Sequence, residues 1–278
     1  MSETQMIENQ GTRAQKIVTI YDDIYDLPDC RSYYRAMDHA GFRTAHFATM
    51  AFRKALTALK TERALTRANV VDFASGYGIA AQLMRHVIGL DDVLSRYREA
   101  WFDDATEADV IAADRAWLAD NRRDEADRYI GIDIAGNALS YGRDVGIFDA
   151  IFPENLQDGA PSAKLTAELA EIDLIVECGS VAHMLPDALD HLLSACPRKP
   201  WVILSPIRGN DTAEAFEVLK AHGLRVDDAV SDPFPHRAFS NADEQRRAIA
   251  NAQDRGYDTE CLESNGHFHA QIFLAKPA

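Results

Sequence analysis

Short apolar runs recur along the chain from about residue 69, and helical stretches separate them. The seven runs read VVDFA, RYIGIDIA, FDAIF, IDLIVECG, PWVILSP, LRVDDAV and HFHAQIFLA. Runs of four to six residues rich in Val, Ile and Leu that alternate with helices are typical of a parallel sheet covered on both faces. The pattern therefore predicts an α/β fold, and it leaves open the relative direction of the last two strands.

The N-terminal part divides into a tail and a helical cap. Residues 1–18 are polar and without periodicity, which predicts a disordered tail. Residues 19–66 carry many aromatic side chains at helix-like intervals, so we expect two or three helices that form a cap, followed by a main domain over 67–278. The rings either pack the cap onto the core or form a lid over a ligand.

A helical insertion is expected at about residues 88–128, because this connection is far longer than a single crossover needs. Thr106 and Asp109 predict a capping box, and the apolar positions predict a helical hairpin with one buried stripe. From Asp91 to Arg128 the insertion has 12 acids and 6 bases, so −6 of the net charge of −15 lies here. This surface is either a solvated face or a rim that selects a cationic substrate or a partner. The expected stripe comprises Leu94, Tyr97, Trp101, Val110, Ala113 and Trp117.

Composition excludes several classes of partner. A net charge of −15 disfavours binding to the phosphates of nucleic acid. No run of eighteen apolar residues predicts a membrane span, and the start of the chain lacks the apolar core of a secretory signal, so we expect a cytoplasmic protein. The four cysteines form no C-x-x-C pair and are expected to be free thiols, with no metal site. A homodimer is left open.

The stretch VVDFASGYGIAA combines a strand, a turn of small residues and the start of a helix. Gly76 and Gly78 remove side chains where a ligand could press against the backbone, and a helix start offers unpaired N–H groups. GYGIAA also satisfies G-x-G-x-x-A, which is typical of dinucleotide sites and keeps an NAD(P)-dependent oxidoreductase as an alternative. However, Asp72 precedes Gly76 by four residues, and its charge disfavours a pyrophosphate. A ligand with a cationic amine fits better.

The turn resembles the first motif of the class I S-adenosylmethionine (SAM)-dependent methyltransferases, acid-x-Gly-x-Gly-x-Gly, with alanine in place of the first glycine. The resemblance extends over about residues 69–278 and implies that SAM is the cofactor. It places the acid after the second strand on the ribose hydroxyls, and the pair after the third strand beside the adenine. The cofactor site implied in this way comprises Asp72, Ala74, Gly76, Gly78, Asp133, Ile134, Asn155, Leu156, Glu177 and Cys178.

The same resemblance implies a seven-stranded, mostly parallel sheet with helices on both faces, whose last strand, within GHFHAQIFLA, is antiparallel. Tyr21 and Tyr25 lie in the segment that many family members fold over SAM, where a tyrosine ring can shield the sulfonium. His183 follows the fourth strand and is the candidate general base, against a packing role at a helix start.

Other histidines carry weaker signals. His267 and His269 share one face of a strand, but no third metal ligand accompanies them, so solvent-facing positions are favoured. His236 and Arg237 lie in DPFPHRAF, which is either a structural loop or part of a substrate pocket.

The sequence as a whole favours methyl transfer from SAM to a small-molecule acceptor, on oxygen or nitrogen rather than carbon, in secondary or specialised metabolism. Methyl transfer depends mainly on alignment and exclusion of water, so a catalytic base is optional. The alternatives are the oxidoreductase named above and a non-catalytic protein that uses the SAM fold to bind a partner through its acidic insertion.

Overall fold

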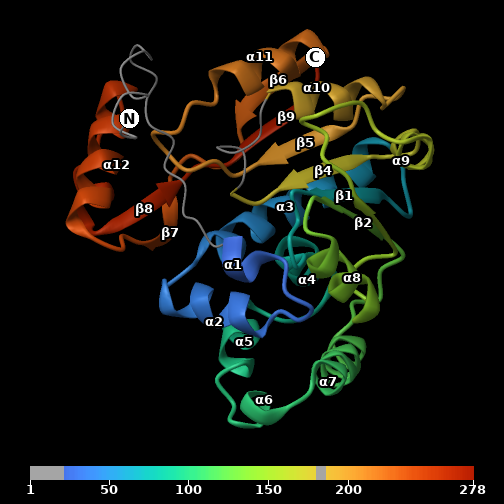
Figure 1. Ribbon diagram of the computed structural model, residues 1–278. Helices are drawn as coiled ribbons and strands as arrows, with labels where there is room; N and C mark the ends of the chain where they lie inside the picture. The colour runs from blue at the N-terminus through green and yellow to red at the C-terminus, as the bar shows by residue number, and fades with distance from the viewer. Residues whose placement is uncertain (1–21, 180–185) are drawn as a thin grey trace, which may run out of the picture.

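A seven-stranded sheet forms the centre of the chain (Figure 1). The computed structural model describes residues 22–179 and 186–278. The strand order is β3-β2-β1-β4-β5-β9-β6; β1 to β5 pair in parallel, and β9 runs antiparallel to both of its neighbours. The predicted seven-stranded, mostly parallel sheet with an antiparallel last strand is confirmed. The strands are β1 (Asn69–Phe73), β2 (Arg128–Asp133), β3 (Ala150–Pro153), β4 (Leu174–Glu177), β5 (Trp201–Leu204), β6 (Leu224–Asp228) and β9 (Phe273–Pro277).

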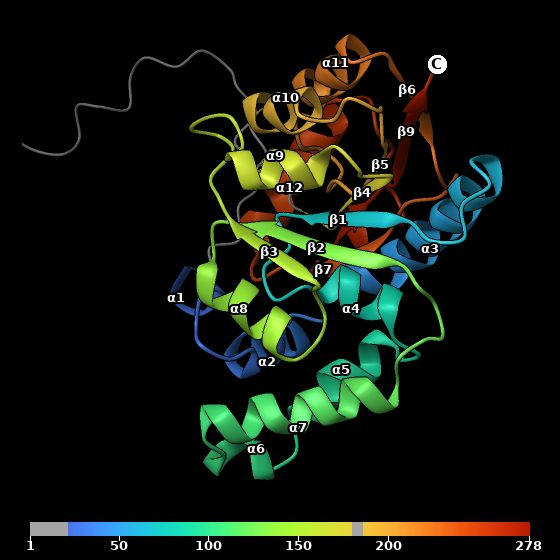
Figure 2. The same cartoon turned by 90° about the vertical axis from the view of Figure 1, so that its right-hand side faces the viewer.

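Helices cover both faces of this sheet (Figure 2). Successive strand residues point to opposite faces, so Val70 packs in one core and Val71 in the other. The two cores bury the central strands on both sides. This burial explains why these strands appear in the sequence as continuous apolar runs. One face carries α3 (Thr44–Glu62), α4 (Ile79–Arg85) and α8 (Gly136–Asp144); the other carries α9 (Ala163–Leu169), α10 (Pro186–Ser194) and α11 (Ala213–Ala221).

The last apolar run of the sequence forms two strands instead of the one that was predicted. β8 (His267–Ala270) leaves the main sheet and pairs with β7 (Phe234–Ala238) in a separate two-stranded sheet. Only the following residues enter the main sheet as β9. The change of sheet takes place where the amide of Gln271 donates to the carbonyl of Pro206, 3.1 Å away. The helix α12 (Ala242–Asp254) and a short 3-10 turn, η2 (Glu263–Asn265), contact this small sheet.

The N-terminal segment forms three helices, of which α3 covers the sheet, while α1 (Asp22–Tyr25) and α2 (Arg31–His39) form a cap. The expected aromatic face is present: Tyr33 and Tyr34 are buried, and the Tyr34 ring stacks on Tyr97 of the insertion with centroids 5.2 Å apart. Tyr21 and the predicted tail lie outside the described residues.

The insertion contains three helices, not a simple hairpin: α5 (Leu90–Arg96), α6 (Trp101–Asp104) and α7 (Glu107–Asp120). The capping box of Thr106 and Asp109 is confirmed. Trp101 was expected in the buried stripe but is 48% exposed, because a new helix starts there and turns its side chain outward. Asp114, which the periodicity gave no reason to bury, is fully buried and accepts hydrogen bonds from Tyr97, Tyr141 and Arg96.

Candidate functional site at the carboxyl edge of the sheet

The turn after β1 has an unusual backbone. Ala74, Gly76 and Gly78 have φ angles of +52°, +51° and +78°, so every second residue lies in the left-handed region. A residue with a Cβ loses roughly 1–2 kcal/mol in this conformation, which explains why glycine suits these positions. Ala74 carries that cost, and it is the one position at which the chain departs from the glycines of the resembled motif.

Protein side chains closely approach both glycines. A Cβ on Gly76 would stand 3.0 Å from the ring of Tyr25, and a Cβ on Gly78 would stand 2.6 Å from the ring of Phe148. Gly78 therefore serves the packing of the helix layer. Gly76 lets the cap approach the turn.

Asp133 ends β2 with its carboxylate fixed against the turn. One oxygen accepts the Gly76 amide at 2.7 Å, and the other accepts the Ala135 amide at 2.9 Å. Burial raises the pKa of Asp133, and these amides act in the opposite direction. Each carboxylate oxygen has a second lone pair, so the group can still accept from a ligand. Ile134, the next residue, is 72% exposed and presents an apolar surface beside it.

We expected the charge of Asp72 to face the ligand, whereas its side chain contacts the backbone of α4. Its carboxyl group is buried and accepts the amide of Ala81 at 3.0 Å, in the first turn of α4. It supplies the cap that Gly78, without a side chain, does not provide. Burial, with smaller contributions from Asp133 and Glu177, raises the pKa of Asp72 to about 8. Burial thus favours the protonated form of Asp72 far more than is usual for an aspartate.

The end of β4 reaches the same place from the other side of β1. The Glu177 side chain is buried and lies 3.4 Å from the amide of Ser205, which follows β5. Burial raises the pKa of the Cys178 thiol, and the Glu177 and Asp72 carboxylates raise it further. Burial also raises the pKa of Tyr25, to which Asp133, Asp72 and Cys178 contribute. These groups thus form one cluster at the point where strand order reverses.

Ser75 belongs to the site although the sequence patterns did not single it out. Its hydroxyl is buried within the turn and has no hydrogen-bond partner among residues 22–179 and 186–278. A buried polar atom without a partner is costly unless a ligand or water satisfies it. The available signal was its place between Ala74 and Gly76, where both neighbours have positive φ.

The pair after β3 is placed differently from the rest. Asn155 is exposed, donates to Asp158 at 2.7 Å and accepts the amide of Gln157, so its side chain stabilises a local turn. The Leu156 side chain is buried in the core beneath α9 and α10. Contact of Asn155 and Leu156 with adenine stays a prediction.

His183 and Tyr21 both lie outside the described residues. His236, however, lies at the end of β4: its Cε1 atom is 3.8 Å from where a Cβ on Gly179 would stand, and its Nδ1 is hydrogen-bonded to the Thr44 hydroxyl. Its neighbour Arg237 is instead buried in an ion pair with Glu244 at 2.7 Å. The sequence placed both residues in one loop, but in the structure His236 approaches the end of β4 whereas Arg237 forms an ion pair elsewhere.

The remaining chemical groups do not form a second centre in the part of the chain that is described. His267 is exposed and His269 is buried, and no three metal-binding side chains cluster within the described ranges. The cysteines are free thiols. None of the described helices combines the length and apolar character needed to cross a bilayer.

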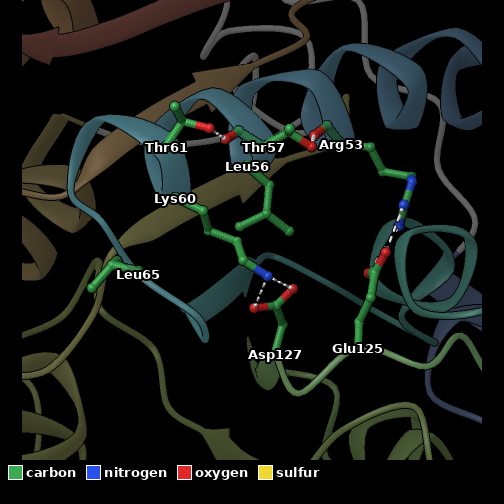
Figure 3. Close-up of a pocket in the computed structure, with 8 residues that line it drawn as sticks. All are labelled: Arg53, Leu56, Thr57, Lys60, Thr61, Leu65, Glu125 and Asp127. Carbon is green, nitrogen blue, oxygen red and sulfur yellow. Dashed lines mark hydrogen bonds and ion pairs between the residues drawn. The ribbon is translucent and has the colours of Figure 1, made fainter.

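A surface pocket lies at the opposite edge of the sheet, near the amino ends of β1 and β2 (Figure 3). Its charged side chains are paired with one another: Lys60 with Asp127 at 2.9 Å, and Arg53 with Glu125 at 2.9 Å. Asp127 also accepts the amide of Ala68. The charges of this pocket are engaged in holding α3 to the segments that enter the strands.

No protein-family model and no curated protein matches the chain. Solved structures do match, among them SAM-dependent methyltransferases. A TehB-like SAM-dependent methyltransferase from Corynebacterium glutamicum is 14% identical over 87% of this chain and 94% of its own, with a TM-score of 0.41. The magnesium protoporphyrin IX methyltransferase of Synechocystis, solved with bound SAM, is 11% identical over 89% and 95%, with a TM-score of 0.39. The plantazolicin methyltransferase BamL, solved with S-adenosylhomocysteine (SAH), is 12% identical over 89% and 90%, with a TM-score of 0.44.

Proposed function

We propose that this chain, which has the sheet of a class I methyltransferase, binds SAM at the carboxyl edge and transfers its methyl group to a small molecule. The observation that carries the proposal is Asp133. Its carboxylate is fixed by the Gly76 amide, stands next to the exposed side chain of Ile134 and lies beside the turn after β1, the strand at which the order reverses toward β4. This is the place where open α/β sheets bind ligands.

The residues present fit an adenosyl sulfonium. A carboxylate with lone pairs to spare suits the two ribose hydroxyls, and an exposed isoleucine suits the face of an adenine. The buried hydroxyl of Ser75 offers a further polar contact within the turn. The Tyr25 ring lies against Gly76 and covers the turn. The cofactor would supply a methyl group that its positive sulfur activates toward attack by an electron pair of the acceptor.

The protein's own residues would then align and enclose the reactants. Tyr25 and the cap would exclude water from the turn, and an aromatic ring suits a neighbouring cation. A nearby cation would favour the charged form of Asp72, which burial disfavours. His236, whose ring approaches Gly179 after β4, is a further candidate base. With His183 it forms the pair of candidate bases.

A nicotinamide dinucleotide fits this site less well. The pyrophosphate of such a ligand would lie beside the Asp133 carboxylate at the turn, and two like charges at this distance are unfavourable. The turn's amides at Gly76 and Gly78 are also already bonded to Asp133 and to the Ser75 carbonyl. The oxidoreductase alternative is therefore less favoured than methyl transfer.

The acceptor is proposed to be a small molecule methylated on oxygen or nitrogen, in secondary metabolism. The support is the enclosed position of the turn beneath α1 and the net charge of −15, which disfavours nucleic acid. A cap of this kind suits a reactant small enough to be enclosed with the cofactor.

Calorimetric titration with SAM, SAH and NAD tests the proposal. We expect SAM and SAH to bind and NAD not to bind, and we expect Asp133→Ala to weaken SAM binding. Incubation with labelled SAM and a small-molecule extract should then give a labelled product. Tight NAD binding without SAM binding would contradict the proposal, and SAM binding without any product would favour the non-catalytic alternative.

A further inference from the structure

We propose that Tyr77 is a positioning residue that, through the backbone of the cap, holds the Tyr25 ring over the turn and so slows release of the cofactor. The inference rests on the proposed SAM site. It adds a role for a residue of the turn that points away from the ligand.

The Tyr77 hydroxyl makes two hydrogen bonds to the same residue of the cap. It accepts the amide of Leu27 at 2.9 Å and donates to the carbonyl of Leu27 at 2.9 Å. Tyr77 is 1% exposed, so water does not replace these bonds easily. One side chain of the turn thus fixes both polar groups of a cap residue 50 positions earlier.

The residue between Tyr25 and Leu27 is anchored as well. Asp26 accepts the amides of Asn137 and Ala138 at 2.7 and 3.2 Å, in the first turn of α8. That turn follows the Asp133 and Ile134 pair directly. The segment from Tyr25 to Leu27 is therefore attached to both parts of the proposed site, the turn after β1 and the start of α8.

These anchors determine where the Tyr25 ring lies. The ring stands 3.0 Å from the position of a Cβ on Gly76 and packs edge-on against Tyr33, with centroids 5.4 Å apart. A molecule bound beside Gly76 would contact this ring. Because Leu27 is two residues away, release of its hydrogen bonds should be a step in opening the segment.

The packing of the Tyr77 ring can be separated experimentally from the hydrogen bonds of its hydroxyl. Tyr77 contacts the rings of Tyr33 and Tyr141, with centroids 5.2 and 5.8 Å apart. Tyr77→Phe keeps these contacts and removes only the hydroxyl. Two matched controls exist: Tyr34→Phe removes a buried hydrogen bond from the cap to Gln82, and Tyr129→Phe removes a buried hydroxyl that has no partner among the described residues.

The test measures displacement of bound labelled SAM by excess SAH, together with hydrogen exchange of the Leu27 amide in the ligand-free protein. We expect Tyr77→Phe to speed displacement by about five- to tenfold, the value of one or two hydrogen bonds, and to speed exchange at Leu27. Tyr34→Phe and Tyr129→Phe should stay within about twofold of the wild type. In a Tyr25→Ala background, Tyr77→Phe should add no further acceleration, because the hydroxyl acts through that ring.

Three results would overturn the inference while leaving the SAM site intact: wild-type displacement in Tyr77→Phe, slower displacement in Tyr77→Phe, or the same acceleration with and without Tyr25. If the wild-type protein binds neither SAM nor SAH, the proposed function itself fails. Exchange at Leu27 then still shows whether the hydroxyl closes the segment.

Discussion

The two edges of the central sheet carry acids in opposite circumstances. At the amino edge, Asp127 pairs with Lys60, Asp149 pairs with Arg85, and Asp173 pairs with Arg198. At the carboxyl edge, Asp72 and Asp133 accept backbone amides, and no ion pair joins either of them to a base in the described part of the chain.

The difference separates a structural acid from one available to a ligand. The Arg85 guanidinium and the Tyr129 amide together outweigh burial and hold the pKa of Asp149 below its usual value. Burial raises the pKa of Asp72 and Asp133 instead. An acid that is buried without a cation is destabilising in its charged form, and a bound cation would relieve that cost. This contrast supports the proposal of a positively charged ligand at the carboxyl edge, whereas the acids of the amino edge already have cationic partners.

The largest effect should come from filling the space at Gly76. Gly76→Val places a branched side chain at φ +51° and against the Tyr25 ring, so we expect a loss of about 3 kcal/mol or more in unfolding free energy, and loss of SAM binding. Gly146→Val, before β3 at the amino edge, has φ +89° and nothing within 4 Å, and should lose only about 1–2 kcal/mol. Urea unfolding compares the two, and equal losses would show that contact with Tyr25 is unimportant.

Removing one acid from each edge should affect different properties. Asp133→Ala should weaken SAM binding by about 1–3 kcal/mol through lost hydrogen bonds to the ribose. Asp127→Ala should instead lower stability, because Lys60 and the Ala68 amide lose their partner, and should leave the affinity for SAM unchanged. Calorimetry with thermal unfolding checks both, and a loss of affinity in Asp127→Ala would weaken the contrast between the edges.

The pH dependence of stability should have opposite signs at the two edges. The pKa of Asp72 is raised to about 8, so the folded state retains a proton that the unfolded state loses near pH 4, and stability falls as pH rises between these values. Asp72→Asn should remove this fall, which amounts to about 2 kcal/mol between pH 5 and pH 7.

The pKa of Asp149 is lowered, so its contribution is present above pH 4 and is lost as pH falls through the folded-state value. Asp149→Asn should therefore be less stable than the wild type at neutral pH, and the difference should shrink in acid. Denaturant unfolding at several pH values measures both slopes. The same pH dependence in Asp72→Asn as in the wild type would remove the evidence for a neutral Asp72.

The smallest effect is expected at the pocket of the amino edge. Lys60→Ala leaves Asp127 with the Ala68 amide, so we expect a loss of about 1 kcal/mol in stability. SAM affinity should not change. Thermal unfolding and calorimetry together check this, and altered SAM affinity would show that the two edges are coupled.

Much of the fold could be predicted because the central strands are buried on both sides. Such strands appear in the sequence as continuous apolar runs, and the capping box at Thr106 is a local signal of the same kind. The division of the last run into β8 and β9 could not be read in this way, since both strands are apolar and only their partners differ. The burial of Asp114 depends on two tyrosines from other elements.

The sequence predicted that Asp72, Asp133 and the glycines meet at one edge of the sheet, and the structure places them there. Their role in binding a cofactor stays a prediction. The spacing gave no information on burial, so it did not reveal that burial raises the pKa of Asp72. The contact of Tyr25 with Gly76 joins residues 51 positions apart, and a tertiary contact of that range leaves no periodic signal.

The buried carboxylate of Asp114 helps to attach the insertion to α8 and, through Tyr97, to the cap. It joins Tyr97 of the insertion to Tyr141 of α8, and Tyr97 in turn stacks on Tyr34 of the cap. Deletion of α5 to α7 would therefore remove a packing partner of the cap, which also carries Tyr25. The acidic insertion packs directly against the cap, and a shortened engineered variant would need a substitute for this contact.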